Sequence, residues 1–467
     1  MSRAICWFKN DLRVDDNPAL TAAAQAGTLI AVYCADGRFA GDSEYGMPKL
    51  GPHRRAFIAQ ALVALRERLG ALGVQLVLAC GEPDAVIPRL AQDNQMDSVW
   101  TASETAPEEI EQTRRVRRAL SRLDVTLHET RPNTLHDRAD LPFDLVDMPR
   151  VFTRFRRRIE RSINPAHPID APRDRVGLEA ADLSCIEAFE PAGWAAAETR
   201  FVGGENVARA HLWRYLWQTR AVMHYKDTRN RLMGDGVSSK LSPWLATGCL
   251  SVRRVADELA RFESEVAANE STYWLSLELR WREFFHWVLA RHGARLFARS
   301  GLLDRHDRPV AADPAVIEAW KTGHTGMPFV DANMRELAAT GYMSNRGRQN
   351  VASYFARDLG QDWRWGAAWF EAQLIDYDVA SNWGNWANIA GVGTDKRDQG
   401  FNVLAQALQY DHDAEYVSQW LPELEVLRRA QRHTPWLAEA DTLKAIGYPQ
   451  LATIPPCWGE LAGATSA

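Results

Sequence analysis

The change of hydrophobic pattern along the chain constrains the fold more than any other feature. In the first third, short apolar runs rich in Val, Ile, Leu and aromatic residues alternate with helical patterns at residues 53–72 and 107–123. Such alternation is typical of a doubly wound parallel sheet covered by helices. The predicted strands are residues 3–8, 28–34, 74–80, 98–101 and 125–128.

The remaining two thirds read as helical. Helical periodicity is found at residues 208–219, 252–261, 273–291, 327–340 and 348–359, whereas the stretch before them is rich in Pro and Arg and has no strand pattern. At 467 residues the chain is long for a single core. We therefore predict an α/β domain at residues 1–133, an interdomain connector at 134–204 and an all-helical domain at 205–467.

Composition narrows the class of protein. Hydrophobic residues make up 46% and charged residues 25% of a chain with net charge -5. No apolar run approaches the roughly 20 residues of a membrane span, and the N-terminus has no signal pattern, so we expect a cytoplasmic protein. The six cysteines have no paired spacing, so neither a disulfide framework nor a metal site is expected.

Local clusters of arginine matter more for nucleic-acid binding than the net charge. The main cluster comprises Arg150, Arg154, Arg156, Arg157, Arg158 and Arg161, followed by Arg173 and Arg175. The alternative explanation of this cluster is a basic helix face exposed to solvent.

Residues 376–386 combine two carboxylates, an amide and two indoles. Asp376, Asp378, Asn382 and Trp386 would converge on one side of a helix or helix-turn. Burying acids and amides is costly unless a partner satisfies them, so the segment predicts a pocket for a large, flat ligand with polar edges. A hydrogen-bonded helix in an ordinary core is the alternative.

Other segments add to this pattern. Ser-Ser-Lys-Leu-Ser-Pro-Trp-Leu lies at 238–245, Asn-Arg-Gly-Arg-Gln-Asn-Val-Ala-Ser at 345–353, and an aromatic stretch with a carboxylate at 274–285. Together with residues 376–386 they resemble the photolyase/cryptochrome flavoproteins, and the cryptochrome DASH branch in particular. The similarity runs from residues 4–13 to about residue 424 and so covers nearly the whole chain.

The resemblance implies an FAD site in the helical domain. In the family, Arg348 and Asp376 would form an ion pair facing the flavin ring, Asp378 would meet its pyrimidine edge, and Asn382 would face N5. The other cofactor-binding positions that it implies are Tyr225, Ser238, Ser239, Lys240, Leu241, Ser242, Arg282 and Asn345.

The chemistry of these residues suits a flavin nucleotide. Ser238, Ser239 and Ser242 offer hydroxyls in a turn before a helix, where backbone N–H groups favour phosphate, although such serines are often only helix caps. When an Arg forms an ion pair with the Asp, it compensates the negative charge of the carboxylate. The Asp then does not oppose reduction of the flavin ring to an anion. The Asn382 amide can donate or accept beside N5.

The resemblance also implies an electron relay and a substrate site. Trp386, Trp363 and Trp320 match the family's three-tryptophan chain, although a single Trp is more often a core residue.

Trp281 would stack on a pyrimidine dimer, and Glu278, one turn earlier, would supply a hydrogen-bonding carboxylate. Asn345 and Gln349 would complete the polar edge. Asn388 replaces an expected aromatic residue, which puts the second stacking wall in doubt.

We therefore expect a deoxyribodipyrimidine photolyase that uses FAD and blue light to repair cyclobutane pyrimidine dimers in DNA. One stacking wall recovers less of the cost of extruding a dimer, which favours single-stranded substrate. The first alternative is a blue-light photoreceptor that signals without repair. A weaker one is an electron-transfer flavoprotein that does not bind DNA.

A second chromophore, an antenna such as methenyltetrahydrofolate, is usual in the family. The acidic stretch 104–109 lies near the family's folate-contacting acid, and Glu108 is the contact that we predict. A favourable charge at a helix N-terminus is the alternative explanation of Glu108.

Overall fold

The computed structural model describes residues 2–172, 181–184, 186–195, 197, 199–307, 311–395, 400–451 and 458. Arg173 and Arg175 of the predicted basic cluster lie outside these residues. The chain forms two compact units. The first comprises Met1–Lys226, Ser239–Ala294 and Ile375–Ser381, and the second comprises Asp227–Ser238, Arg295–Leu374 and Asn382–Ala467. Both units draw on the predicted helical domain, and the predicted boundaries at 133 and 204 stay a prediction.

A parallel sheet forms the centre of the first unit. Its strand order is β3-β2-β1-β4-β5, and Ile5 lies opposite Ile30 on one side and Val99 on the other. Every neighbouring pair is parallel, which confirms the predicted doubly wound sheet. The strands are β1 (Arg3–Phe8), β2 (Thr28–Ala35), β3 (Gln75–Cys80), β4 (Ser98–Ala102) and β5 (Thr126–Thr130).

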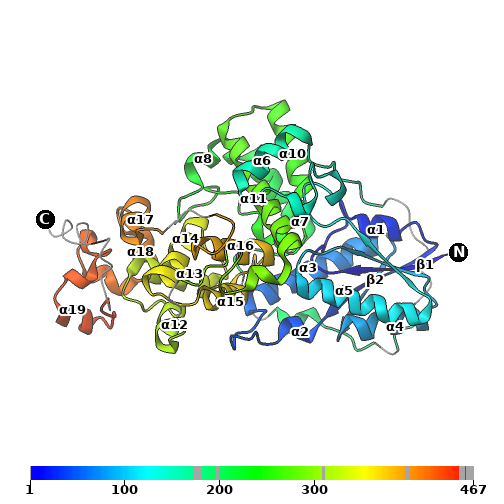
Figure 1. Cartoon of the computed structure of the whole chain (residues 1–467), viewed down its shortest axis with the longest axis horizontal. Coiled ribbons are helices and arrows are strands. Elements are labelled where there is room, and N and C mark those ends of the chain that lie inside the picture. The colour runs from blue at the N-terminus through cyan, green and yellow to red at the C-terminus, as the bar shows by residue number, and fades with distance from the viewer. Residues whose placement is uncertain are drawn as a thin grey trace. The chain divides into compact units, whose positions relative to one another are not determined.

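Helices cover both faces of this sheet. Four of them begin with proline, whose fixed φ and missing N–H suit the first helical position. Ile87 of α4 and Val116 of α5 pack with Ile5 and Val32 in one buried cluster. In Figure 1, α1 lies above the strands and α4 and α5 below them. These helices are α1 (Pro18–Ala23), α2 (Gly37–Ala40), α3 (Pro52–Ala71), α4 (Pro83–Asp93) and α5 (Pro107–Leu120).

From residue 205 onward the described chain is helical, as predicted, and one helix, Phe152–Ser162, also lies within the predicted connector. Two helices predicted at 208–219 and 348–359 end in a turn of π-helix, Arg214–Gln218 and Tyr354–Asp358. The first unit contains α6 (Phe152–Ser162), α7 (Glu205–Trp213), α9 (Ser242–Ala246), α10 (Val252–Glu265) and α11 (Glu270–His292), and α8 (Tyr225–Thr228) begins there. The later helices are α12 (Pro314–Lys321), α13 (Pro328–Thr340), α14 (Asn345–Ser353), α15 (Trp363–Gln373), α16 (Val379–Ile389), α17 (Val403–Tyr410), α18 (Glu415–Trp420) and α19 (Ala440–Ala445).

Single turns of 3-10 helix occur at Ser121–Leu123, Arg138–Asp140, Leu145–Asp147, Pro191–Trp194, Ala221–His224, Gly293–Phe297, Pro422–Val426, Arg429–Gln431 and Pro435–Leu437. Within the part of the chain that the structure describes, no helix is both long and apolar enough to cross a membrane.

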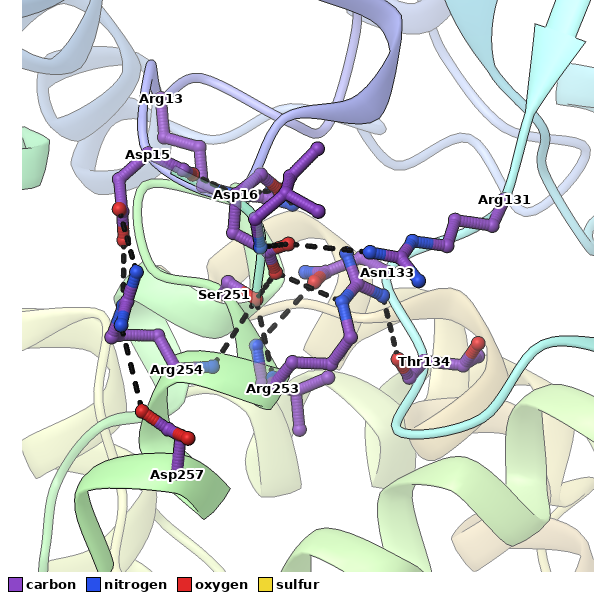
Figure 2. Close-up of polar contacts among 12 residues, drawn as sticks. Arg13, Asp15, Asp16, Arg131, Asn133, Thr134, Ser251, Arg253, Arg254 and Asp257 are labelled. Atoms are coloured by element: carbon purple, nitrogen blue, oxygen red, sulfur yellow. Dashed lines mark hydrogen bonds and ion pairs between the residues drawn. The ribbon is translucent and has the colours of Figure 1, made fainter. Parts of the chain in front are cut away.

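A buried carboxylate joins three distant stretches of the first unit (Figure 2). Asp16, just after β1, is fully buried and accepts hydrogen bonds from Ser251 Oγ, from Arg253 Nε at 2.9 Å and from the Ile169 N–H at 3.0 Å. Arg131 adds an ion pair at 3.6 Å. Since both carboxylate oxygens are occupied by protein donors, this cluster holds the loop after β1 against the start of α10.

A second ion pair strengthens the same junction. Arg254 binds the Asp15 carboxylate through two nitrogens at 2.9 Å and lies 3.5 Å from Asp257. The Glu205 carboxylate accepts the backbone N–H groups of Val14 and Asp15 at 2.8 and 3.1 Å. The loop after β1 is therefore fixed to the starts of both α7 and α10.

Candidate functional site

The long helix α11 carries the polar and aromatic groups that define the candidate site in the first unit. Its N-terminus is fixed by a capping box between Asn269 and Thr272. Glu278, Arg282 and His286 follow one another at intervals of four residues and so share one face of the helix. The motifs pointed to Glu278 and Arg282 but not to His286, although this spacing places all three on one face of the helix.

Trp281 lies on the same helix with one ring face covered. The Phe152 ring stacks on it with centroids 3.6 Å apart and an interplanar angle of 14°. Phe285 lies 5.7 Å from the indole at 28°, and the Trp281 side chain remains partly exposed. A ring supported on one side and partly exposed is suited to stack on a nucleobase. Phe152 is the first residue of α6 and was not predicted as a site residue. Its role depends on stacking against Trp281, which lies far away in the sequence.

Asp378 is held by two side chains of α11 and by one backbone N–H group, all in the first unit. Its Oδ1 accepts the Ser381 N–H at 2.8 Å, and its Oδ2 lies 2.9 Å from His286 Nε2 and 3.5 Å from the nearest Arg282 nitrogen. Burial would raise the pKa of this carboxyl, but the charges of His286 and Arg282 hold the pKa well below its usual range. Asp378 is therefore a carboxylate that can accept further hydrogen bonds.

Arg282 connects this carboxylate to other segments of the first unit. It donates to the Asn133 carbonyl at 2.7 Å and to the Leu245 carbonyl of α9 at 3.4 Å. Burial lowers the pKa of its guanidinium, and Asp378 opposes that shift. The guanidinium thus keeps α9, which ends the serine-rich segment, close to Asp378.

The serine-rich segment forms a turn that leads into α9. Ser242 is the first residue of α9, and the Ser239 carbonyl accepts from His211 Nε2 at 2.8 Å. Lys240 has a φ of 48°, a left-handed conformation that non-glycine residues adopt rarely and that is often found at functional turns. Leu241 and Tyr225 are buried. Ser238 belongs to the second unit.

In the second unit, α14 presents the predicted polar edge. Ser344 caps α14 by accepting the Gly347 N–H at 3.0 Å, so Asn345 is its first residue. Arg348 donates to the Met343 carbonyl at 2.9 Å. Gln349 Oε1 is buried and has no partner among the described residues. An unsatisfied buried acceptor is costly, so Gln349 is suited to receive a hydrogen bond from a ligand.

Asn382, on α16, is almost buried and donates through Nδ2 to the Ala367 carbonyl at 3.0 Å. Its carbonyl oxygen is therefore the atom left to accept a hydrogen bond. Asp376 is also buried, in the first unit. The predicted pairing of Asp376 with Arg348 stays a prediction.

The three predicted relay tryptophans all lie in the second unit. Trp386 and Trp320 have ring centroids 6.0 Å apart, and Trp363 packs on Trp383 at 5.7 Å. Trp320 is fully buried and donates to the Val351 carbonyl at 3.2 Å. The structure therefore places Trp320 next to Trp386 in the core, and the order of electron transfer stays a prediction.

Close packing fixes the position of Trp386 against α15. A Cβ at Gly366 would lie 2.2 Å from the Trp386 ring, so no other residue fits there without displacing the indole. Trp363 is three residues earlier on α15 and thus on the same side of the helix. Trp383, which is not among the predicted relay residues, extends this aromatic cluster.

The side chain of Asn388 is engaged in a turn. Its Oδ1 accepts from the Thr394 N–H at 2.7 Å and from the Thr394 hydroxyl at 3.1 Å. Asn388, which stands where a second stacking residue was expected, instead stabilises this turn through its side-chain amide. Replacing it by Tyr would remove both hydrogen bonds.

Two acids lie near the carboxyl ends of the strands. The side chain of Glu108, the predicted antenna contact, is 63% exposed and pairs with Lys49 at 2.8 Å. Glu104, after β4, is more buried and lies 3.9 Å from Lys9, which follows β1. Burial raises the pKa of Glu104, and Lys9 partly offsets this. β1 and β4 flank the point where the strand order reverses, which is where open parallel sheets usually bind ligands.

Comparisons with known proteins agree with this arrangement. Residues 4–173 match the family model for DNA photolyase, and residues 274–455 match that for the FAD binding domain of DNA photolyase. Cryptochrome DASH of Natronomonas pharaonis is 46% identical over 452 residues, which cover 94% of each chain. Cryptochrome DASH of Synechocystis is 42% identical over 454 residues, covering 95% of this chain and 92% of its own.

Solved structures show the same relationship. The crystal structure of a Synechocystis cryptochrome superimposes with a TM-score of 0.92 at 40% identity, covering 100% of this chain and 98% of that one. A class III photolyase from Agrobacterium tumefaciens gives 0.84 at 29% identity, with coverage of 100% and 97%. Fold and matched models thus define a flavoprotein of the photolyase class. Within that class, the chain belongs to the cryptochrome DASH family.

Proposed function

We propose that this protein is a blue-light-dependent photolyase that repairs cyclobutane pyrimidine dimers, preferentially in single-stranded DNA. The observation that carries this proposal is the Trp281 ring, supported on one face by Phe152 at 3.6 Å and followed one residue later by Arg282, a partner of Asp378. Glu278 lies on the same side of α11 and would hydrogen-bond the damaged bases. Stacking and hydrogen-bonding groups thus share one helix face.

FAD fits the donor set that the structure presents. Bound FAD would supply light absorption and the transferable electron. Asp378 would accept an N–H of the pyrimidine edge, the Asn382 carbonyl oxygen would face N5, and Arg348 would pair with Asp376. The remaining residues that we assign to FAD are Tyr225, Ser238, Ser239, Lys240, Leu241, Ser242, Arg282 and Asn345.

The orphan acceptor of Gln349 and the amide of Asn345 would complete the polar edge toward the dimer. Trp386 would be the first residue of an electron relay that also uses Trp363 and Trp320. Its close packing on Gly366 would hold the indole in one position.

The preference for single strands follows from the energetics of extrusion. Enzymes of the photolyase class extrude the damaged bases at a cost of about a few kcal/mol, which is smallest for a single strand. Stacking on one aromatic side chain returns roughly 1–3 kcal/mol per base. Because the Asn388 amide is engaged with Thr394, we assign the aromatic wall to Trp281 alone. One wall offsets the cost more readily in a single strand.

The test is light-dependent repair of dimer-containing oligonucleotides, single-stranded and duplex, under the same salt and light dose. We expect faster repair of the single strand, and loss of repair in Trp281→Leu and Glu278→Gln. Trp213→Leu, on the exposed side of α7, is the matched control. Equal repair of both substrates would reject the preference, and full repair by both variants would reject the site.

The alternative is a blue-light photoreceptor that uses flavin redox change without repairing DNA. The engagement of Asn388 in a turn favours it, because an incomplete stacking site weakens dimer binding. The same assay separates the two functions. A photoreceptor would reduce its flavin in light but leave the dimers intact in both substrates.

We also propose an antenna chromophore such as methenyltetrahydrofolate, contacted by Glu108, and a cytoplasmic location. Absorption spectra of the purified protein, with and without Glu108→Gln, test the antenna. A spectrum accounted for by FAD alone after reconstitution with the folate would reject it.

A further inference from the structure

His286 lies between the candidate flavin contact and the edge of the sheet. Its Nε2 is 2.9 Å from Asp378 Oδ2, and its Nδ1 is 3.4 Å from the Thr105 hydroxyl, in the loop after β4. The imidazole is 13% exposed, and Thr105 is buried. One side chain on α11 thus connects two segments that are 273 residues apart, from position 105 to position 378.

The partners of His286 accommodate two protonation states. A carboxylate can only accept hydrogen bonds, so Nε2 carries a proton in this arrangement. Nδ1 can then accept from the Thr105 hydroxyl in the neutral ring or donate to it in the charged ring, because the hydroxyl rotates. The imidazole can therefore gain or lose a charge beside Asp378 without moving.

Other charged groups near His286 lie on α11 and at the edge of the sheet. On α11 itself these are Arg282 and Glu283, and Glu283 is engaged by His136 at 2.9 Å. In direct contact, however, His286 meets only the Asp378 carboxylate among the charged groups of the described residues. From the edge of the sheet, the Glu104 carboxylate also interacts electrostatically with His286.

We propose that His286 is a positioning residue for Asp378. It fixes the orientation of the carboxylate and sets how much negative charge this group presents to bound FAD. The proposal rests on the assignment of Asp378 to the flavin under the proposed function. A charged imidazole compensates the carboxylate and favours flavin reduction, whereas a neutral one leaves the negative charge in place.

The first test compares FAD binding in the wild type and three variants. His286→Phe removes the donor to a carboxylate, and we expect its FAD dissociation constant to rise about tenfold. His286→Gln keeps an N–H donor and should bind within about threefold of the wild type. His412→Gln, at an exposed histidine, is the matched control.

The second test follows the midpoint potential of the bound flavin between pH 5 and pH 9. The wild type should show an inflection that His286→Gln lacks, because an amide does not titrate. Nitrogen-15 NMR of the apoprotein gives a readout without flavin. The His286 Nε2 resonance should be that of a protonated nitrogen hydrogen-bonded to a carboxylate.

The outcomes separate this proposal from the function on which it rests. If Asp378→Asn weakens FAD binding but His286→Phe does not, the positioning role is rejected and the flavin site stands. If Asp378→Asn also leaves FAD binding unchanged, the assignment of Asp378 to the flavin fails. Should His286→Phe not fold, a His286→Gln protein that keeps the wild-type inflection would still overturn the charge-setting role.

Discussion

Asp16 and Asp378, two aspartates of the first unit, both lie near arginines but differ in their hydrogen-bond partners and in their exposure to solvent. Asp16 is fully buried and its donors are Ser251, Arg253 and the Ile169 N–H, with Arg131 nearby. The Asp378 side chain is 13% exposed, with one hydrogen-bonded histidine, one backbone N–H and an arginine at 3.5 Å. A carboxylate saturated by its own chain holds segments together. One that is partly open, and still kept ionised, can serve a ligand.

The largest expected effect is the loss of stability when Asp16, the carboxylate at the centre of the saturated cluster, is replaced. Asp16→Ala leaves Arg253 buried without its carboxylate, which costs about 3–5 kcal/mol of unfolding free energy. Denaturant unfolding of the apoprotein measures this cost. Glu265→Ala removes an exposed pair with Arg261 and should change stability little. If both variants unfold at the same denaturant concentration, Asp16 does not hold the junction.

Asp378→Asn should separate the two kinds of aspartate. Losing a hydrogen bond to a charged group costs about 1.5–3 kcal/mol, so we expect FAD affinity to fall roughly 10–100-fold. The apoprotein should lose less stability than in Asp16→Ala. Fluorescence titration with FAD and unfolding of the apoprotein provide the two measurements. Unchanged affinity with a large loss of stability would place Asp378 with the structural carboxylates.

Acid should reveal the lowered pKa of Asp378. A carboxyl with a lowered folded-state pKa contributes stability that is present above its unfolded pKa of about 3.9 and is lost as the pH falls toward the folded value. The stability difference between wild type and Asp378→Asn should thus shrink as the pH falls below about pH 4. A difference that grows in acid would contradict the lowered pKa.

The smallest effect concerns three arginines for which the described residues provide no carboxylate partner. Arg154, Arg157 and Arg161 lie exposed on one stripe of α6, whereas Arg156 donates to Tyr273 at 2.8 Å and Arg158 to the Pro142 carbonyl at 3.0 Å. Replacing the three stripe arginines by Ala should lower the salt dependence of single-strand binding by about 0.7 per lost phosphate contact. Stability should stay unchanged.

Arg156→Ala is the matched control for these three replacements, since it removes an arginine of the same helix whose guanidinium donates to Tyr273 of α11. It should lower stability with little effect on the salt dependence. An unchanged salt slope in the triple variant would leave the stripe as a solvated face of α6.

The fold was predictable because it depends on periodic patterns. All five strands lie within a few residues of their predicted bounds, since buried parallel strands are short apolar runs between turns. The turns of π-helix after α7 and α14 could not be predicted, because the same periodicity continues through them.

The site was less predictable. Its residues on α11 and near residue 378 were found from motifs, but His286 acts through a residue 92 positions away. Phe152 likewise gains its role by stacking on Trp281. Local sequence indicates neither contact. The engagement of Asn388 by Thr394 is local, yet it depends on the course of the loop between them.

The Asp16 cluster has a consequence for the synthesis of the chain. Asp16 and Arg253 are separated by 237 residues. At a translation rate of about 5–20 residues per second, the arginine leaves the ribosome roughly 12–50 s after the aspartate. During that interval β1 can be complete while the loop after it awaits its partners. Native closure of the N-terminal sheet region is therefore a late, long-range event, and contacts of this range slow folding.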